Sequence, residues 1–303
     1  MMRFSSPARL VALVLLASGA PAAAARAQLR PNFATPGVLR VCADPDNMPL
    51  SNEKEEGFEQ KIAELIAHEW NSRVQYAWWP VRRGYFARAL NGRYCDVAIE
   101  APSGLDMAGV TKPYFRSGYF FVTRKDSGLD ITSLADPRLK TLRIGVNLLN
   151  SDAENPPPVM ALSRYGVVGN LTGYTTFFSD QVRPEDIING VVNKDVDIAI
   201  VWGPLAGYFA KKSPVPLQLT PLGERDSLSD YPFRFDIGLG VRRRDRALRD
   251  SLQTVLDRKR PEIEAILKEY GVPMFPIQEG SQEKSTGTTT APTADTGKKA
   301  GSG

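Results

Sequence analysis

The stretch Leu39–Phe58, LRVCADPDNMPLSNEKEEGF, decides the fold. Its first residues, 39–43, form a short apolar run that predicts a buried strand. The run breaks at Pro45 and the Asx residues beside it, because proline cannot donate to a sheet ladder and Asx side chains favour turns. After Gly57 apolar residues recur at helical spacing, at Phe58, Ile62, Leu65, Ile66 and Trp70. The sequence therefore predicts a strand, a polar loop and a helix in succession.

The polar loop is the first candidate for a wall of a binding site. In parallel sheets such loops lie at the carboxyl ends of strands, where open α/β folds bind their ligands. We expect Asp44, Asn47 and Met48, within the segment 44–51, to face that site. The alternative is an ordinary connection between a strand and a helix.

Strand and helix patterns continue to alternate along the chain. Strands are predicted at 74–79 and 96–100, with a short helix at 86–90 between them. A second set has strands at 142–147, 172–178 and 197–202 and helices that begin at Val159, Pro184 and Pro204. Two further helices are predicted after Asp245 and from Pro261 to Gly271. This alternation is typical of α/β proteins with parallel sheets.

Two long extended runs, Tyr114–Arg124 and Phe233–Val241, lead from one set to the other and back. They cross near residues 119–123 and 235–241. Two crossings predict two lobes joined by a hinge, with a cleft between them, which is a venus-flytrap arrangement. We expect lobe 1 to comprise 38–120 plus 240–275, and lobe 2 to comprise 121–239.

Neither end of the chain is predicted to belong to the fold. Residues 1–27 have a basic start, an apolar core at 10–20 and small residues around Arg26, which is typical of a cleavable secretory signal peptide. The apolar core is too short to span a bilayer, and no later segment is longer. We therefore expect a periplasmic protein. The tail, 278–303, is rich in Ser, Thr, Gly and Lys, and this composition predicts disorder.

Composition excludes several classes of function. Subtracting the three arginines of residues 1–27 from the formal net charge of +4 leaves +1, so the high isoelectric point does not indicate nucleic-acid binding. The chain has one histidine, His68, and two cysteines, which argues against a metal site or haem and iron–sulfur cofactors. His68 lies beside Glu69 and Trp70 on the first helix, and we expect it on the surface.

The two cysteines, Cys42 and Cys95, belong to the first and third predicted strands. If those strands pair, an oxidising compartment favours a disulfide, provided that the Cα atoms approach within about 7 Å. The alternative is two separate buried thiols.

Between Leu39 and Tyr270 the chain resembles the bacterial extracellular solute-binding proteins of family 3. The resemblance is carried by LRVCADPDNMPLS, ALNGRYCDVAI, KPYFRSGYFFVTRKDSG, GVVNKDVDIAIVWGP and the final EYG. It implies an α/β, periplasmic-binding-protein-like (type II) fold. Many members of this family deliver polar amino acids to ABC transporters.

The residues that hold an α-amino acid in those relatives are replaced here. An arginine about nine residues before the Pro-Tyr pair binds the carboxylate in the family, and that position is Gly104. An aspartate that binds the ammonium is replaced by Trp202. In the family, a loop of small residues follows the first strand of the second lobe, and its backbone N–H groups bind the carboxylate. In this chain that loop is Leu-Leu-Asn-Ser, 148–151. Burying a zwitterion without these partners costs several kcal/mol, so we expect a different ligand.

A narrower resemblance is to the periplasmic J-type accessory proteins (MxaJ/XoxJ) of quinoprotein methanol dehydrogenases. It is carried by LRVCADPDNMPLSNEKEEGFEQKIAELIA, YAWWPVRRGYFARAL, YCDVAIEAPSG and LNSDAENPPPVMALSRYGVVGN. The resemblance implies a partner, namely a pyrroloquinoline-quinone (PQQ) methanol dehydrogenase, with the lanthanide-dependent type included, or its cytochrome c. It implies no cofactor and no metal held by the J protein itself.

Further side chains are predicted at the cleft or at a partner interface. Trp78, Trp79, Arg82, Arg83 and Tyr85 form an aromatic and basic cluster after the second strand, of a kind common in binding hot spots; alternatively one tryptophan is core and the arginines are solvated. The other candidates are polar or aromatic residues at predicted strand ends and loops: Glu100, Ser103, Asp106, Asn147, Ser151 and Trp202. Glu100 stands out, because a carboxylate at the end of an apolar strand needs a partner. Arg82 and Arg83 are the candidate partners.

These patterns predict a non-catalytic accessory protein that acts on a methanol dehydrogenase system through protein–protein binding. The first alternative is an ABC-transporter receptor for a small ligand that is not an α-amino acid. The second is an enzyme on this fold, for which Glu100 is the candidate general acid or base. The run Arg242-Arg243-Arg244 before the C-terminal helices is predicted to be solvated, with the docking of an acidic partner as the alternative.

Overall fold

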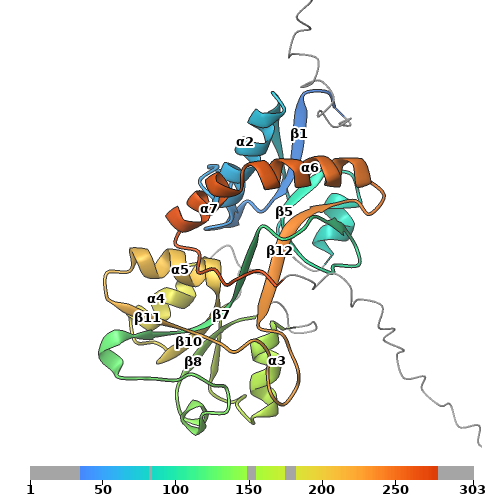
Figure 1. The fold of residues 1–303 in the computed structure, drawn as a ribbon. Coiled ribbons are helices and arrows are strands. Elements are labelled where there is room, and N and C mark those ends of the chain that lie inside the picture. Colours follow the sequence, from blue (N-terminus) through green and yellow to red (C-terminus); the bar gives the residue numbers. More distant parts are fainter. Residues whose placement is uncertain (1–34, 82–83, 149–154, 175–181, 279–303) are drawn as a thin grey trace, which may run out of the picture. The chain divides into compact units, whose positions relative to one another are not determined.

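The computed structural model describes residues 35–81, 84–148, 155–174 and 182–278 (Figure 1). Its strands fall into two groups that share one continuous path, in the order β4-β1-β5-β12-β7-β10-β8-β9. The predicted signal peptide, 1–27, and all of the predicted C-terminal tail after residue 278 lie outside the described residues.

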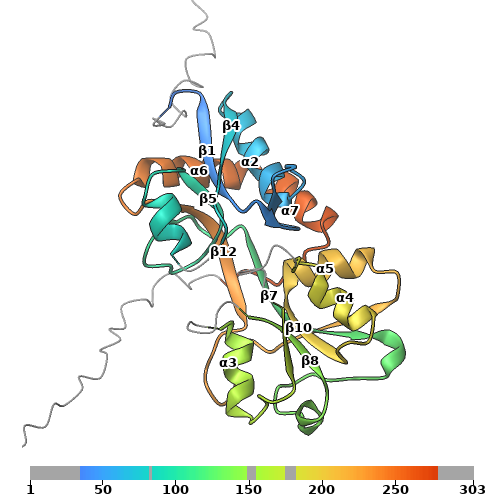
Figure 2. The same ribbon diagram turned by 180° about the vertical axis from the view of Figure 1, so that it is seen from behind.

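The first group centres on three parallel strands. β1 (Val38–Ala43) pairs with β4 (Arg73–Trp78) on one side and with β5 (Val97–Pro102) on the other. Figure 2 shows β4 beside β1 at the edge of the sheet. Helices α2 (Phe58–Glu69), α6 (Arg246–Arg258) and α7 (Arg260–Glu269) pack on one another beside these strands (Figure 1).

Alternate strand residues supply two hydrophobic clusters, one on each face of this sheet. Leu39 and Val41 of β1 pack with the helices α2, α6 and α7. Cys42 packs on the other face, with Ala98 of β5 and the helical turn η2 (Phe86–Leu90). Glu100 follows Ala98 by two residues, so strand geometry directs its side chain to the second face.

The second group contains β7 (Phe115–Arg124), β10 (Ile198–Trp202), β8 (Ile144–Asn147), β9 (Leu171–Tyr174) and β11 (Leu217–Pro221). β8 is parallel to both β10 and β9, whereas β7 is antiparallel to β10 and β11. The helices of this second group are α3 (Pro157–Arg164), α4 (Asp186–Val192) and α5 (Gly203–Lys212). β10 alternates in the same way as β1, because Ile200 and Val201 belong to two different clusters.

The long strands β7 and β12 (Arg234–Val241) connect the two groups and pair with each other in antiparallel fashion. They correspond to the two extended runs expected from the sequence. Arg116 of β7 donates from Nη1 to Asp236 Oδ2 of β12 at 2.9 Å, and both side chains are buried. Glu224 is a second ion-pair partner of Arg116. This buried charge pair fastens the two connecting strands to each other.

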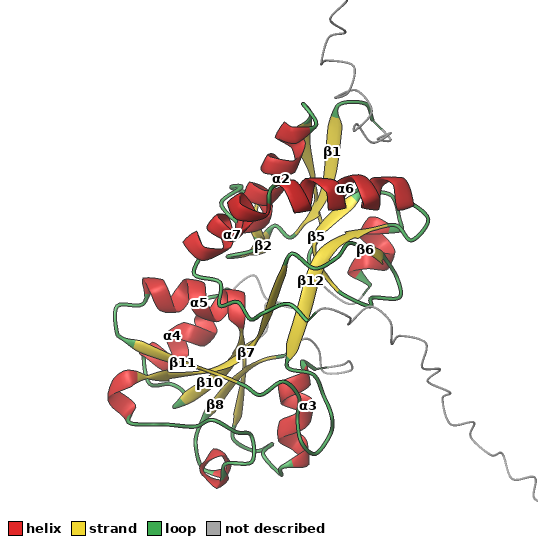
Figure 3. Cartoon of the chain, viewed as in Figure 1, coloured by secondary structure: helices red, strands yellow, loops and turns green. Residues whose placement is uncertain are grey.

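Several boundaries differ from the sequence-based prediction. α3 begins at Pro157, two residues early, because proline is compatible with the first turn of a helix. α4 begins at Asp186, so Pro184 lies in the preceding turn and is not the first helical residue. β11, the hairpin β2–β3 (Asp46–Asn47 with Ser51–Asn52) and β6 (Gly109–Val110), which lies beside β12 in Figure 3, were not predicted. β2, β3 and β6 have only two residues each, which is too short to show a period.

A disulfide joins Cys42 and Cys95, with 5.2 Å between their Cα atoms. The strands β1 and β5 pair directly, Cys42 opposite Ala98, which brings Cys95 just before β5 within reach. The predicted disulfide is thus confirmed. No helix in the described ranges is long and apolar enough to cross a membrane.

Candidate functional site

The carboxyl ends of the parallel strands β1, β4 and β5 bring together side chains that are distant in the sequence. Asp44 follows β1, Trp79 follows β4, and Glu100 lies near the end of β5. Parallel strands end at the same edge of a sheet, so these residues share one edge. The sequence-based prediction of a binding site at this edge rested on the same property of parallel strands.

Asp44 ties the loop after β1 to its surroundings. Its Oδ1 accepts from the backbone N–H of Asp46 at 3.0 Å, and its Oδ2 accepts from that of Val81 at 2.6 Å. The backbone N–H of Asp44 in turn donates to Ser51 Oγ at 3.0 Å. The segment 44–51 therefore has a defined shape, and Asp44 has a structural part in maintaining it.

Glu100 forms the central polar contact of the site. The indole Nε1 of Trp202 donates to Glu100 Oε1 at 3.1 Å, across 102 positions of sequence. The second carboxyl oxygen, Oε2, is inaccessible to solvent and accepts no hydrogen bond from any residue that the structure describes. Burial raises the pKa of Glu100 to about 7, against the opposing effect of the Trp202 hydrogen bond. Glu100 therefore exchanges its proton near neutral pH.

A second buried carboxyl group, Glu59, lies near Glu100. It is at the first turn of α2 and hydrogen-bonds to Ser51. Burial, followed by the charge of Glu100, raises the pKa of Glu59 well above its ordinary value. Two neighbouring buried carboxyl groups resist simultaneous ionisation, so the site favours a protonated form or a ligand that carries hydrogen-bond donors.

Three tyrosines surround these carboxyl groups. Burial is the main cause of the raised pKa values of Tyr85, Tyr114 and Tyr119, and the charge of Glu100 adds to each shift. The Tyr114 hydroxyl donates to the carbonyl oxygen of Ile99 at 2.9 Å. All three phenols therefore remain protonated at physiological pH and present neutral groups to the site.

Trp202 is held in place by two other aromatic rings. Its ring centroid lies 5.4 Å from that of Tyr119 and 5.9 Å from that of Phe235. Trp202 ends β10, and Tyr119 is its direct cross-strand partner in β7. Trp202 thus forms part of a packed aromatic wall, and its one hydrogen-bond donor is directed to Glu100.

The aromatic and basic cluster predicted after β4 is divided in the structure. Trp78 stacks on Tyr76 with 5.1 Å between ring centroids, whereas Trp79 packs near Tyr94 at 5.3 Å. Consecutive strand residues point to opposite faces, which explains the division. Tyr85 is buried in the cluster around the disulfide. Arg82 and Arg83 lie outside the described residues.

The remaining predicted residues occupy different environments. Asn47 and Met48 are half-buried in and after strand β2, and Asp106 is exposed in the turn before β6. Ser103 directly follows β5, and its Oγ is buried without a hydrogen-bond partner among the described residues. Asn147 is half-buried at the end of β8. Ser151 lies outside the described residues.

Sequence reasoning missed Glu59, Tyr114 and Tyr119, whereas Ser51 lies within the segment 44–51 that was expected to form a wall of the site. For Glu59 a signal was present: it precedes Ile62 and Ile66 by three and seven residues, so it shares the buried face of α2. A carboxylate on an apolar helix face is unusual and marks a position that needs a specific environment. The two tyrosines carry no comparable signal, since an aromatic residue in a buried strand is ordinary.

The chemistry of the site is that of its carboxyl groups and tyrosines. No group of three or more His, Cys, Asp or Glu within the described ranges is placed to hold a metal ion. His68 is exposed on α2, as predicted. The carboxyl groups and tyrosines can accept and donate hydrogen bonds, and an ionised Glu100 can bind a cation.

Replacing Glu100 with glutamine is expected to stabilise the protein increasingly as the pH rises. The folded pKa of about 7 lies above the ordinary value of 4.5, so the folded state loses stability as the pH rises through that window. Glutamine keeps an acceptor for Trp202 and removes the charge. We expect urea denaturation to show little difference at about pH 5 and a gain of up to about 3 kcal/mol at about pH 8. A gain of equal size at both pH values would show that Glu100 ionisation is not its cause.

Comparison with known proteins shows which class of fold the chain has. The chain is similar to the crystal structure of the periplasmic binding protein XoxJ from Methylobacterium extorquens AM1, with 35% identity, a TM-score of 0.64, and coverage of 79% of this chain and 100% of that one. The chain is also similar to the crystal structure of MxaJ from Methlophaga aminisulfidivorans MPT. The identity is 28%, the TM-score is 0.68, and the match covers 78% of this chain and 100% of that one. The protein therefore has the α/β fold of the periplasmic binding proteins, as predicted.

The family follows from a curated relative. Protein MoxJ of Methylorubrum extorquens is 33% identical over 251 residues, which cover 80% of this chain and 83% of that protein. The chain belongs to the MoxJ family. The resemblance identified from the sequence is thereby confirmed, although no general family model matches the chain.

Proposed function

We propose that the protein is a periplasmic accessory protein of a PQQ-dependent methanol dehydrogenase system. It assembles, activates or stabilises the dehydrogenase by binding it or its cytochrome c, and it catalyses no reaction itself. The observation that carries this proposal is membership of the MoxJ family, together with the likeness to XoxJ and MxaJ. The likeness to the periplasmic binding protein XoxJ also supports export through the predicted signal peptide.

The candidate site supports a role other than amino-acid transport. Gly104, at the position of the expected carboxylate-binding arginine, is exposed in a turn with φ of +79°. Trp202, at the position of the ammonium-binding acid, is packed between Tyr119 and Phe235. A zwitterion would lack both charge partners at these positions and would lose several kcal/mol of binding free energy.

The proposal includes the division of the chain into two lobes. Residues 38–120 with 240–275 form one lobe and 121–239 the other, with β7 and β12 as the connections. The separate hydrophobic clusters of the two strand groups support this division.

A second candidate function is that of a transport receptor for a small polar ligand. Two observations favour it: Glu100 Oε2 and Ser103 Oγ are buried without hydrogen-bond partners in the described part of the chain. Buried polar atoms of this kind are satisfied when a bound molecule supplies the missing contacts. Such a ligand would carry hydrogen-bond donors.

Thermal unfolding with a panel of solutes separates the two functions. A ligand at about a hundred times its Kd adds about 2.7 kcal/mol of stability and raises Tm by several degrees. We expect no shift of Tm with the standard amino acids. In a separate capture experiment, we expect the protein to retain a PQQ methanol dehydrogenase or its cytochrome c from the periplasm of methanol-grown cells. A clear shift with an amino acid, and no captured dehydrogenase component, would reject the proposal.

A further inference from the structure

A surface pocket of about 540 Å³ is lined by none of the residues assigned to the candidate site. It is lined by the turn after η2, the end of the β5–β6 connection and the segment between β12 and α6. The lining residues are Asn91, Arg93, Met107, Arg242, Arg243, Arg244 and Asp245. We call this the arginine pocket, since four arginines face one aspartate.

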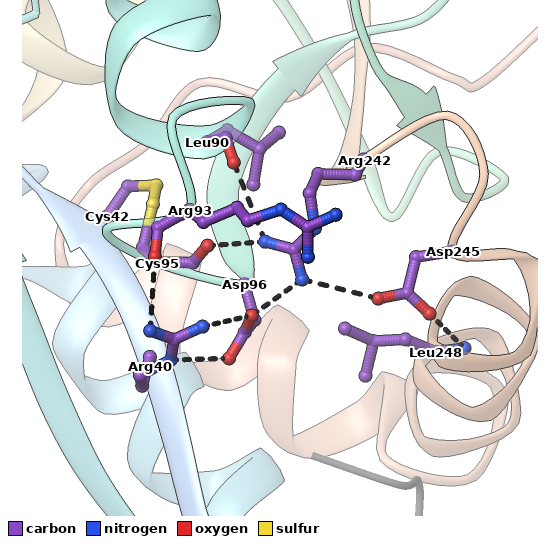
Figure 4. Close-up of polar contacts among 9 residues, drawn as sticks. All are labelled: Arg40, Cys42, Leu90, Arg93, Cys95, Asp96, Arg242, Asp245 and Leu248. Carbon is purple, nitrogen blue, oxygen red and sulfur yellow. Dashed lines mark hydrogen bonds and ion pairs between the residues drawn. A yellow bond between two sulfur atoms is a disulfide. The ribbon is translucent and has the colours of Figure 1, made fainter. Parts of the chain in front are cut away.

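Arg242 forms the fixed floor of the arginine pocket. Its guanidinium donates to Asp96 Oδ1 at 2.6 Å and to the carbonyl oxygen of Cys95 at 2.6 Å, as Figure 4 shows. Asp245 accepts from the same guanidinium at 3.4 Å and also caps the first turn of α6. The charge of Asp245 is therefore engaged within the fold, and Arg242 has little freedom to move.

The other three arginines of the pocket are exposed and differ from Arg242 in their contacts. Arg93, Arg243 and Arg244 have no acidic partner within the described ranges. In Figure 4 the Arg93 side chain points toward Arg242, with which it lines the pocket. Like charges held close together raise the local positive potential and favour the binding of an anion.

We propose that the arginine pocket docks an acidic segment of a partner protein. Carboxylates are suited to this pocket, because each guanidinium offers paired N–H donors in a planar fork that matches a carboxylate group. The pocket also adjoins the N-terminus of α6, whose helix dipole favours a negative charge. The bound Asp or Glu side chains would neutralise Arg93, Arg243 and Arg244.

Apolar groups beside the arginines favour a protein as the occupant. Met107 lines the pocket and is 43% exposed, and Tyr94, next to Arg93, is 59% exposed. Tyr94 in turn packs near Trp79. Arginine, tyrosine, tryptophan and methionine are the residues enriched in protein interfaces, whereas a small inorganic anion gains nothing from an apolar border.

This inference rests on the proposed function for the identity of the partner, but the docking chemistry is testable without it. The probe is a fluorescently labelled hexaglutamate peptide, with hexaglutamine as the uncharged control, measured by fluorescence anisotropy at moderate salt. We expect Arg243→Glu/Arg244→Glu to weaken hexaglutamate binding at least about tenfold, since both charges change sign at the pocket. Higher salt should weaken binding of the unaltered protein.

The matched control is Arg73→Glu/Arg260→Glu, which makes the same change of net charge at exposed positions outside the pocket. We expect it to weaken binding less than about twofold at moderate salt, where distant charges are screened. Equal loss in both variants would overturn the proposal. A milder pair, Arg243→Ala/Arg244→Ala, confirms the result if thermal unfolding shows that the glutamate variant is misfolded.

Two other probes decide the class of occupant. Inorganic phosphate or vesicles with anionic phospholipid that bind at the pocket, while hexaglutamate does not, would overturn the proposal. If Arg243→Glu/Arg244→Glu captures the methanol dehydrogenase system as well as the unaltered protein does, the docking surface is wrong and the proposed function stands. If hexaglutamate binds as expected but no dehydrogenase component is captured, the docking surface stands and the proposed function fails.

Discussion

Asp96→Ala is expected to lower the free energy of unfolding by about 3 to 5 kcal/mol, because it leaves two arginines without their shared partner. Asp96 is 2% exposed. Its two oxygens accept from Arg40 at 2.8 and 2.7 Å and from Arg242 at 2.6 Å (Figure 4). Without the carboxylate, two partly buried guanidinium groups face each other and repel. Urea denaturation at neutral pH measures the loss.

The pKa of Asp96 gives this contribution its pH dependence. Burial alone would raise the pKa, but hydrogen bonds from Arg40 and Arg242 outweigh it and hold the pKa below the ordinary value of 3.8. The stabilisation is therefore complete at neutral pH and is lost as the pH falls below about 4 through the lower folded pKa.

Asp197→Ala is a matched control for Asp96→Ala. Asp197 also precedes a parallel strand and also pairs with an arginine, Arg143, with 2.6 Å between the charged atoms. That pair is more exposed, at 55% for Arg143 and 29% for Asp197, so its removal should cost about 1 kcal/mol. Equal losses for the two variants would show that the buried position of Asp96 adds nothing.

Removing the disulfide is expected to cost about 4 kcal/mol of stability. The bond closes a loop across 53 positions, and a loop of this length restricts the unfolded chain by about that free energy. Cys42→Ala/Cys95→Ala avoids burying new hydroxyl groups, because both positions are fully buried. Urea denaturation of this variant against the oxidised protein measures the effect.

Reductant supplies the control for the disulfide prediction. The chain has only these two cysteines, so a thiol reductant acts on no other bond. It should destabilise the unaltered protein by a similar amount and leave the double alanine variant unchanged. A reduced protein as stable as the oxidised one would contradict the prediction. Cys95 also accepts from Arg242, so we expect the Asp96 and disulfide effects to be non-additive.

The sequence predicted most of the fold, because its local signals were strong. The helix-capping Asp245 accepts from the backbone N–H of Leu248, as its position predicted. Gly166 and Gly271 have positive φ at the ends of α3 and α7, where only glycine adopts this conformation without strain. β11 was missed because it is an edge strand that ends in Pro221.

The candidate site was harder to predict, because its contacts join distant parts of the chain. Glu100 stood out in the sequence as an unusual carboxylate, but the partner that the structure shows, Trp202, lies 102 positions away. No local pattern encodes such a pair. Asp96 was assigned only to a strand, although it connects β1, β5 and the segment before α6. Burial and the convergence of two arginines decide its importance, and both are tertiary properties.

Sedimentation velocity with purified components tests the central claim most directly. The unaltered protein is mixed with a purified PQQ methanol dehydrogenase, and separately with its cytochrome c, at micromolar concentration. We expect a complex with one of them that dissociates as salt is raised and is weakened by Arg243→Glu/Arg244→Glu but not by Arg73→Glu/Arg260→Glu. Absence of a complex with either component, together with saturable binding of an amino acid, would contradict the claim.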